Sequence, residues 1–363
     1  MRTFLKKSVI VTLVFLATSS FVSCDSFESK EENEIEVIAE NNIPIKKDIK
    51  EIVYQDPLVF ITGFDKGSQT YYANARAYFV EKGLTIVDGK YSLEEIIVWL
   101  NENGKQHPFS EIHIVNKSNP YKGMNLETVV KGTKITAESL RRVLTTGTLP
   151  SLKNVVTKDS KVIFHATGLL ENIELLQTLK EAFCAVENPI VVASPYHTIF
   201  GGKFSKQHLA KPYYIFYPTA HSPGKMDLSK EIAKKYPEEK DINWYDALNN
   251  EEERYIGEPY ITQFAVPLRW EFDYYNSDDE MPDFNTEKDV INWIQQQNEL
   301  SEAFEKYTIS IEKFRWNWYV KGTTLIIKGR TTGLCVLKPL IKPYGDLMHI
   351  TPDTSNKRLY TMK

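Results

Sequence analysis

The stretch Leu58-Val59-Phe60-Ile61-Thr62-Gly63 decides the fold class, because it is a continuous apolar run of strand length that ends in a glycine. A strand that is buried on both faces of a sheet has this pattern. Residues 70–82 follow with helical periodicity, and Gly83 closes that helix. A buried strand followed by a helix is the first half of a βαβ unit, so we expect a parallel sheet.

The same alternation of strand and helix continues to about residue 217. We predict further strands at residues 84–87, 111–115, 161–165, 189–193 and 213–217, and helices at residues 92–100, 136–144 and 172–185. Ser92 and Glu95 have the spacing of a capping box, which marks the start of one of these helices. The pattern predicts an α/β fold, a mostly parallel sheet with helices on both faces.

After about residue 218 the pattern changes to a mixed one. We predict helices at residues 229–236, 244–248 and 289–300, and strands at residues 261–272, 324–328 and 333–337. The last two strands flank Gly329-Arg330-Thr331-Thr332, a hairpin signal. The predicted division is a signal peptide at residues 1–23, a tether at 24–55, an α/β domain at 56–220 and an aromatic-rich α+β extension at 221–363.

The first 23 residues have the features of an export signal. Arg2, Lys6 and Lys7 form a basic start, and the apolar run of residues 9–17 is too short to span a bilayer. The sequence Phe21-Val22-Ser23-Cys24 then resembles the lipobox of bacterial lipoproteins, with Phe where Leu is more usual. The resemblance implies that the mature chain begins at Cys24 and is held to a membrane by a lipid on that cysteine. An ordinary cleaved signal and an uncleaved anchor are the alternatives.

Residues 25–36 contain six acidic side chains and one lysine, a composition that predicts a solvated, self-repelling tether. The segment resembles the acidic export tag that follows the lipidated cysteine in surface lipoproteins of the Bacteroidetes group. That resemblance implies a lipid-anchored protein of the outer membrane, facing the periplasm or the cell surface. A plain spacer is the alternative.

The composition of the mature chain limits its partners. Residues 24–363 carry 41 basic and 48 acidic side chains, a net charge of −7, so we expect no nucleic-acid partner. Cys184 and Cys335 fall within apolar patterns, which favours two small buried side chains over a disulfide. Neither cysteine has the spacing of a metal site, and we predict no metal and no cofactor.

Functional residues of an open parallel sheet gather beyond the carboxyl ends of its strands. Residues 56–217 resemble the caspase-like cysteine peptidases in strand order and in the Ala-x-Gly context at residues 166–168. In that family the third strand leads to a histidine and the fourth to a cysteine about 50 residues later. Lys117 and Thr167 occupy those two positions in this chain, so the resemblance implies the fold without the catalytic pair.

These substitutions favour a non-catalytic domain that binds a peptide or protein partner. A lysine of ordinary pKa is protonated and cannot act as a base, and a threonine hydroxyl is a weak nucleophile without one. A hydrolase is the alternative, with either a buried Lys117 acting on Thr167 or a cluster of Asp65, His165 and His197. A second alternative is a glycan-binding module of an outer-membrane uptake system, suggested by the aromatic side chains. The candidate binding residues at this sheet edge are Asp65, Asn119, His165 and His197.

Overall fold

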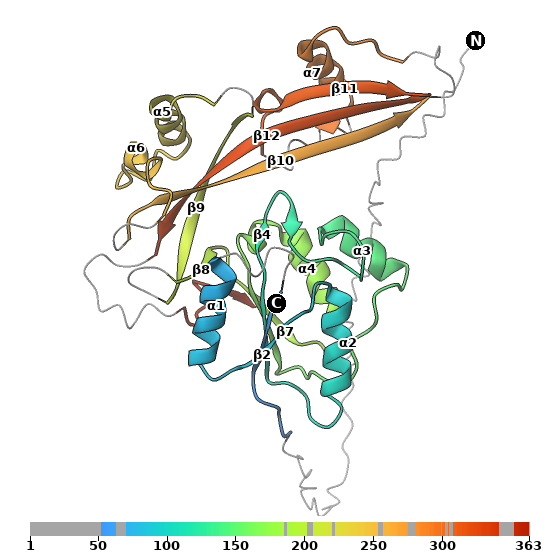
Figure 1. Ribbon diagram of the computed structural model, residues 1–363, viewed down its shortest axis with the longest axis vertical. Coiled ribbons are helices and arrows are strands. Elements are labelled where there is room, and N and C mark those ends of the chain that lie inside the picture. The colour runs from blue at the N-terminus through green and yellow to red at the C-terminus, as the bar shows by residue number, and fades with distance from the viewer. Residues whose placement is uncertain are drawn as a thin grey trace, which may run out of the picture.

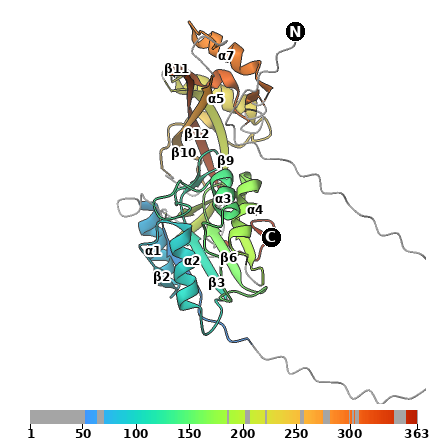
Figure 2. The same ribbon diagram turned by 90° about the vertical axis from the view of Figure 1, so that its right-hand side faces the viewer.

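The computed structural model describes residues 52–62, 70–184, 187–201, 206–219, 222–252, 257–274, 281–298, 300, 301, 304, 308–340 and 352–362. The predicted signal peptide, Cys24, the tether up to residue 51 and Asp65 lie outside these residues. The described chain forms two units, each built on its own sheet. Figure 2 shows the two units at opposite ends of the molecule.

The first unit contains a six-stranded, mostly parallel sheet of order β13-β7-β6-β3-β1-β2. Its parallel strands are β1 (Leu58–Ile61), β2 (Thr85–Val87), β3 (Glu111–Val115), β6 (Lys161–His165) and β7 (Ile190–Ala193). The short β13 (Thr361–Met362) pairs antiparallel with β7 at one edge. The predicted mostly parallel α/β sheet is therefore confirmed.

Helices cover both faces of this sheet, as the sequence predicts (Figure 1). They are α1 (Thr70–Glu81), α2 (Leu93–Asn103), α3 (Ala137–Thr145) and α4 (Ile173–Ala182). Successive side chains of a strand point to opposite faces. Leu58 and Phe60 accordingly join the core under α2, α3 and α4, whereas Val59 and Ile61 join the core under α1.

Local capping signals fix where these helices begin. The Ser92 hydroxyl accepts a hydrogen bond from the backbone N–H of Glu95, and the Glu95 carboxylate accepts one from the backbone N–H of Ser92. This is the predicted capping box of α2. Asn172 caps α4 through its side-chain oxygen, which accepts from the backbone N–H of Leu175.

The second unit is an antiparallel sheet built around one long strand, β12 (Thr324–Pro339). Its other strands are β8 (His197–Phe200), β9 (Gln207–Pro218), β10 (Tyr260–Asp273) and β11 (Arg315–Lys321). β10 lies along one side of β12, and β9 and β11 share the other side (Figure 1). Two helices, α5 (Lys225–Lys235) and α6 (Trp244–Ala247), pack on one face, and α7 (Glu287–Gln295) packs on the other.

One predicted strand belongs to a different sheet from the one expected. Residues 213–217 lie in β9 of the second sheet and pair antiparallel with β12. Tyr213, Ile215 and Tyr217 face the core under α5 and α6, while Tyr214 and Phe216 face the other core. The second sheet therefore begins with β8, ahead of the predicted division between residues 220 and 221.

The predicted hairpin at residues 329–332 is wrong, because β12 runs through it as one continuous strand. The two glycines make room for aromatic rings instead of a turn. A Cβ at Gly329 would lie 2.6 Å from Cζ3 of Trp316, and a Cβ at Gly333 would lie 2.5 Å from Cζ of Phe264. Glycine inside a strand often marks such a close approach.

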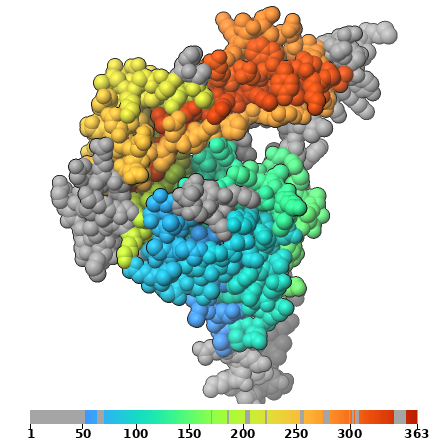
Figure 3. All heavy atoms as spheres, in the orientation of Figure 1, coloured from blue at the N-terminus to red at the C-terminus, as the bar shows by residue number. Residues whose placement is uncertain are grey.

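The chain returns to the first sheet after the second sheet is complete. The Ser194 hydroxyl donates to the Leu359 carbonyl at 2.8 Å, and Tyr360 is buried beside β6 and β7. β13 then pairs with β7. The second sheet thus lies, in chain order, between two neighbouring strands of the first. Figure 3 shows it standing over the first unit, with an open gap between the two on one side.

Candidate functional site

The loops after β3 and β6 meet at the carboxyl edge of the parallel sheet and tie Thr167 to Ser118. The backbone N–H of Ser118 donates to the Thr167 hydroxyl oxygen at 3.1 Å. The Thr167 hydroxyl in turn donates to the Ser118 carbonyl, and the Ser118 hydroxyl donates to the Thr167 carbonyl. The Thr167 proton is therefore directed at a peptide oxygen, which cannot remove it as a base would.

Lys117 reaches the same edge but faces an aromatic side chain. Its backbone N–H donates to the Tyr72 hydroxyl at 2.9 Å, and its ammonium lies 5.6 Å from the centre of the Tyr71 ring. The neighbouring Asn116 is fully buried and fixes the loop by donating to the carbonyls of Thr62 and Asn125. A dyad in which Lys117 took the Thr167 proton would first have to break the bond from Thr167 to Ser118.

Asn119 shapes a turn at this edge. It ends β4 (Ser118–Asn119), which pairs with β5 (Gly123–Met124), and its side-chain oxygen accepts from the backbone N–H of Tyr121 at 2.9 Å. The Tyr121 ring stacks on Phe264 of β10, with centres 5.9 Å apart. This hairpin is thus one of the contacts between the two units.

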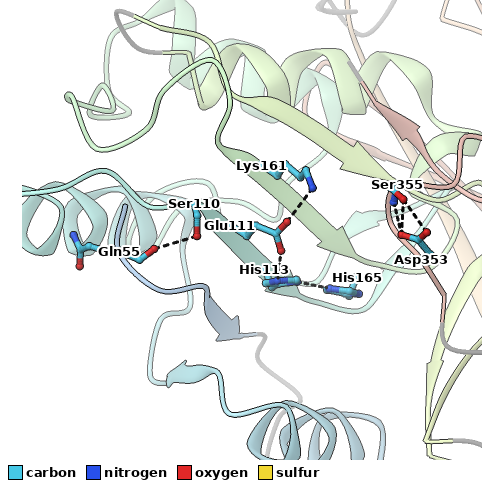
Figure 4. Close-up of polar contacts among 8 residues, drawn as sticks. All are labelled: Gln55, Ser110, Glu111, His113, Lys161, His165, Asp353 and Ser355. Atoms are coloured by element: carbon cyan, nitrogen blue, oxygen red, sulfur yellow. Dashed lines mark hydrogen bonds and ion pairs between the residues drawn. The ribbon is translucent and has the colours of Figure 1, made fainter. Parts of the chain in front are cut away.

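His165 lies in a line of polar groups on the α1 face of the sheet, which we call the histidine chain: Lys161, Glu111, His113 and His165 (Figure 4). The Lys161 ammonium donates to Glu111 at 3.0 Å, and the Glu111 carboxylate lies 3.5 Å from Nε2 of His113. Nδ1 of His113 and Nε2 of His165 share a hydrogen bond of 2.9 Å. Alternate positions of two paired strands bring these groups to one face.

The histidine chain runs from the half-exposed Lys161 and Glu111 to the buried His165. The hydrogen bond from His113, with further help from Lys161, lowers the pKa of Glu111 to about 2. Burial, and then the charge of His113, lower the pKa of His165 well below its usual value. Only 3% of His165 is exposed, and Phe79 and Phe200 pack against its ring. Its Nδ1 has no hydrogen-bond partner within the described ranges.

His197 belongs to a different group, which we call the junction cluster: His197, Tyr214 and Glu171. Nε2 of His197 and the Tyr214 hydroxyl share a hydrogen bond of 3.0 Å, and that hydroxyl lies 3.5 Å from Glu171. Gly168 makes this approach possible, because its φ of 63° is left-handed and a Cβ there would lie 3.2 Å from Nε2 of His197. The structure therefore does not join His165 and His197 in one cluster, and Asp65 lies outside the described residues.

Burial keeps His197 and Tyr214 of the junction cluster uncharged at neutral pH. It lowers the pKa of His197 to about 4, so this imidazole is uncharged at neutral pH. It also raises the pKa of Tyr214 far above its usual value and that of Glu171 to about 7. Glu171 as a residue is exposed, so solvent reduces the effect of burial on the pKa of its carboxylate. No local sequence pattern marks Glu171 and Tyr214 as neighbours, since Tyr214 belongs to the second sheet and Glu171 to the first unit.

The two cysteines and the tryptophans of the second unit are for the most part buried or half-buried. Cys184 and Cys335 carry free thiols, and burial raises the pKa of Cys335. Cys335 is buried, as predicted, whereas Cys184 is only half-buried. Trp244 and Trp316 are buried as well, and the half-buried indoles pack against the same core as Trp316: Trp270, Trp293 and Trp318. These indoles do not form the exposed aromatic stripe on which the glycan-binding alternative depends.

The search for metal sites and the comparisons with known proteins do not point to a particular chemistry. They contain no group of three or more His, Cys, Asp or Glu side chains arranged to hold a metal ion. None of the helices in the described part of the chain combines the length and the apolar character of a membrane span. The sequence matches no protein-family model, and it finds no match among curated proteins.

Proposed function

We propose that this chain is a non-catalytic, lipid-anchored binding protein of the bacterial outer membrane, with a caspase-like first unit that binds a peptide or protein partner. One observation carries the proposal. At the position that the caspase-like resemblance gives to a nucleophile, the Thr167 hydroxyl donates to the Ser118 carbonyl. A side chain held in this way joins two loops and does not attack a carbonyl carbon.

The pairing of β3 with β6 supports the caspase-like part of the proposal. The two strands are parallel neighbours that end level with each other, because Val115 pairs with His165. Lys117 and Thr167 each follow two residues later, at the same edge of the sheet. A caspase-like edge would require this placement, which supports the proposal, while the side chains there serve as structural contacts.

The lack of catalysis is tested on the full chain with casein and a peptide library as substrates. We expect no turnover above the buffer rate, for the wild type and for Thr167→Val alike. Because Thr167→Val removes hydrogen bonds to Ser118, it should lower the free energy of unfolding by about 1–3 kcal/mol. Thr133→Val, at an exposed position, is the control and should change neither quantity. Turnover that Thr167→Val abolishes and Thr133→Val leaves intact would establish the hydrolase alternative.

The lipid anchor is tested by replacing its proposed attachment site. Cys24→Ala should abolish incorporation of an alkyne-tagged fatty acid and move the protein out of the membrane fraction, since Cys24 provides the only thiol of the proposed lipobox. Cys184→Ala, which removes a thiol within the folded part, is the matched control and should label like the wild type. Equal labelling of the two variants would contradict anchorage at Cys24. Release of an unlabelled wild type would indicate an ordinary cleaved signal.

A further inference from the structure

A groove of about 540 Å³ opens on the second sheet, away from the carboxyl edge of the first. Strands β10, β11 and β12 form its floor, its lining surface is mostly apolar, and four cationic side chains lie along it. They are Arg269 of β10, Arg315 of β11, and Lys328 and Arg330 of β12. The three arginines are exposed and Lys328 is half-buried. We call these four residues the basic groove.

Strand register places the four cations in two like-charged pairs. Arg315 lies directly opposite Arg330, and Arg269 lies directly opposite Lys328. Side chains directly opposite each other on an antiparallel pair share a face, about 5 Å apart, and like charges in that position destabilise the sheet. The two pairs are two residues apart along β12, roughly 7 Å. The strand positions of the four residues therefore fall within a small area of the sheet.

The neighbouring carboxylates only partly neutralise this patch. Glu271 accepts from Arg269 at 2.8 Å, and Glu287 lies 3.4 Å from Arg315. Lys328 lies over the Tyr319 ring, 4.9 Å from its centre. In the part of the chain that the structure describes, Arg330 has no carboxylate within ion-pair distance. This excess of positive charge belongs to a chain whose net charge is −4.

We propose that the basic groove is a binding site for an acidic, extended segment of a partner protein. The inference goes beyond the proposed function, because it places a further binding surface on the second sheet and specifies the chemistry of its partner. Alternate side chains of an extended peptide lie on one face about 7 Å apart, which matches the separation of Lys328 and Arg330. Carboxylates at that spacing would neutralise both like-charged pairs and form charge-assisted hydrogen bonds with the guanidinium groups.

The strands beside the groove favour a peptide over other polyanions. Within the described ranges, β10 and β11 each pair with β12 alone, so each has a second edge with no strand beside it. A peptide can add main-chain hydrogen bonds along such an edge and present alternate side chains to the face. A sulfated glycan could neutralise the same charges but cannot form that ladder.

The test measures binding of a fluorescein-labelled peptide of alternating Glu and Thr to the full chain by anisotropy at low salt. Arg315→Gln combined with Arg330→Gln should weaken binding at least tenfold, since each lost charge-assisted bond is worth about tenfold in affinity. Lys105→Gln combined with Lys153→Gln changes the net charge equally at exposed positions of the first unit. This control should bind within twofold of the wild type, and a peptide with Gln in place of Glu should not bind.

The same variants provide the outcomes that would overturn the inference. Equal weakening in both double variants would show that binding follows net charge instead of the groove. Displacement by a sulfated oligosaccharide at lower concentration than by the unlabelled peptide would assign the groove to a glycan. The groove variant should melt no lower than the wild type, because it removes a like-charged pair, so lost binding would not reflect unfolding. If the protein is anchored and inactive but does not bind the peptide, the peptide-binding role of the basic groove is refuted. The proposed lipid anchor and lack of catalysis are not affected by that result.

Discussion

Replacing Trp316 by alanine is expected to lower the free energy of unfolding by about 3–5 kcal/mol, the usual cost of removing a large aromatic side chain from a core. Only 1% of Trp316 is exposed. Its ring stacks on Trp270, with centres 5.6 Å apart, and covers the backbone at Gly329. Its indole N–H also donates to the Ile311 carbonyl at 3.3 Å. The alanine variant would leave a cavity where two strands and a loop meet.

Urea unfolding followed by circular dichroism measures this effect. The matched control is Tyr319→Ala, since Tyr319 lies on the same strand but is 41% exposed, and this variant should cost less than about 1 kcal/mol. Similar losses for the two variants would show that the aromatic core around Trp316 does not hold the second sheet together.

Acidification from pH 6.5 to pH 4 is expected to destabilise the fold by several kcal/mol. Burial lowers the pKa of His197 and of His208 to about 4 and that of His165 well below its usual value. An unfolded histidine takes up its proton near pH 6.5, so between these values the unfolded chain binds protons that the folded chain does not. Stability is complete above pH 6.5 and falls with pH, by on the order of 3 kcal/mol for His197 and the same for His208.

The protonation of Glu171 has the opposite effect on folding stability over part of this pH range. Its pKa is raised to about 7, so the folded chain holds a proton that the unfolded chain releases above about pH 4.5. This group therefore adds stability as the pH falls from 7 to 4.5. One exposed carboxyl does not outweigh three buried imidazoles, so the net effect of acid remains destabilising.

The pH dependence is measured by urea unfolding at several pH values between 4.5 and 7.5. His197→Gln keeps a polar group beside Tyr214 but does not titrate, so the stability of this variant should fall less steeply with pH than that of the wild type. His107→Gln, at an exposed position, should follow the wild type. Identical slopes for all three proteins would mean that His197 does not couple protonation to folding.

The first sheet could be predicted because its signals are local. Buried strands appear as apolar runs, and Ser92 and Asn172 mark helix starts through bonds to residues three positions away. The meeting of Lys117 and Thr167 at one edge follows from the same regularity, since parallel strands end together. What holds Thr167 could not be predicted, because its partner is the backbone of Ser118 and not a side chain.

The junction cluster and the basic groove depend on pairings that a single sequence does not specify. Tyr214 reaches Glu171 only because β9 joins the second sheet, and residues 213–217 carry no local sign of which sheet they join. Arg315 and Arg330 meet only through the register of β11 with β12. The hairpin prediction is wrong at Gly329 because a glycine is compatible both with a turn and with a strand position under an aromatic ring. Only the position of Trp316 distinguishes the two.

The pairing of β13 with β7 also has a consequence for biosynthesis. A ribosome makes β7 first, then the whole second sheet, and only afterwards the residues around Tyr360 that cover β7. Until those residues emerge, the first sheet has an unprotected edge, which is the kind of surface that aggregates. The first unit therefore cannot be completed before the second has been synthesised. The chain has to be synthesised through residue 362 before the first unit can close.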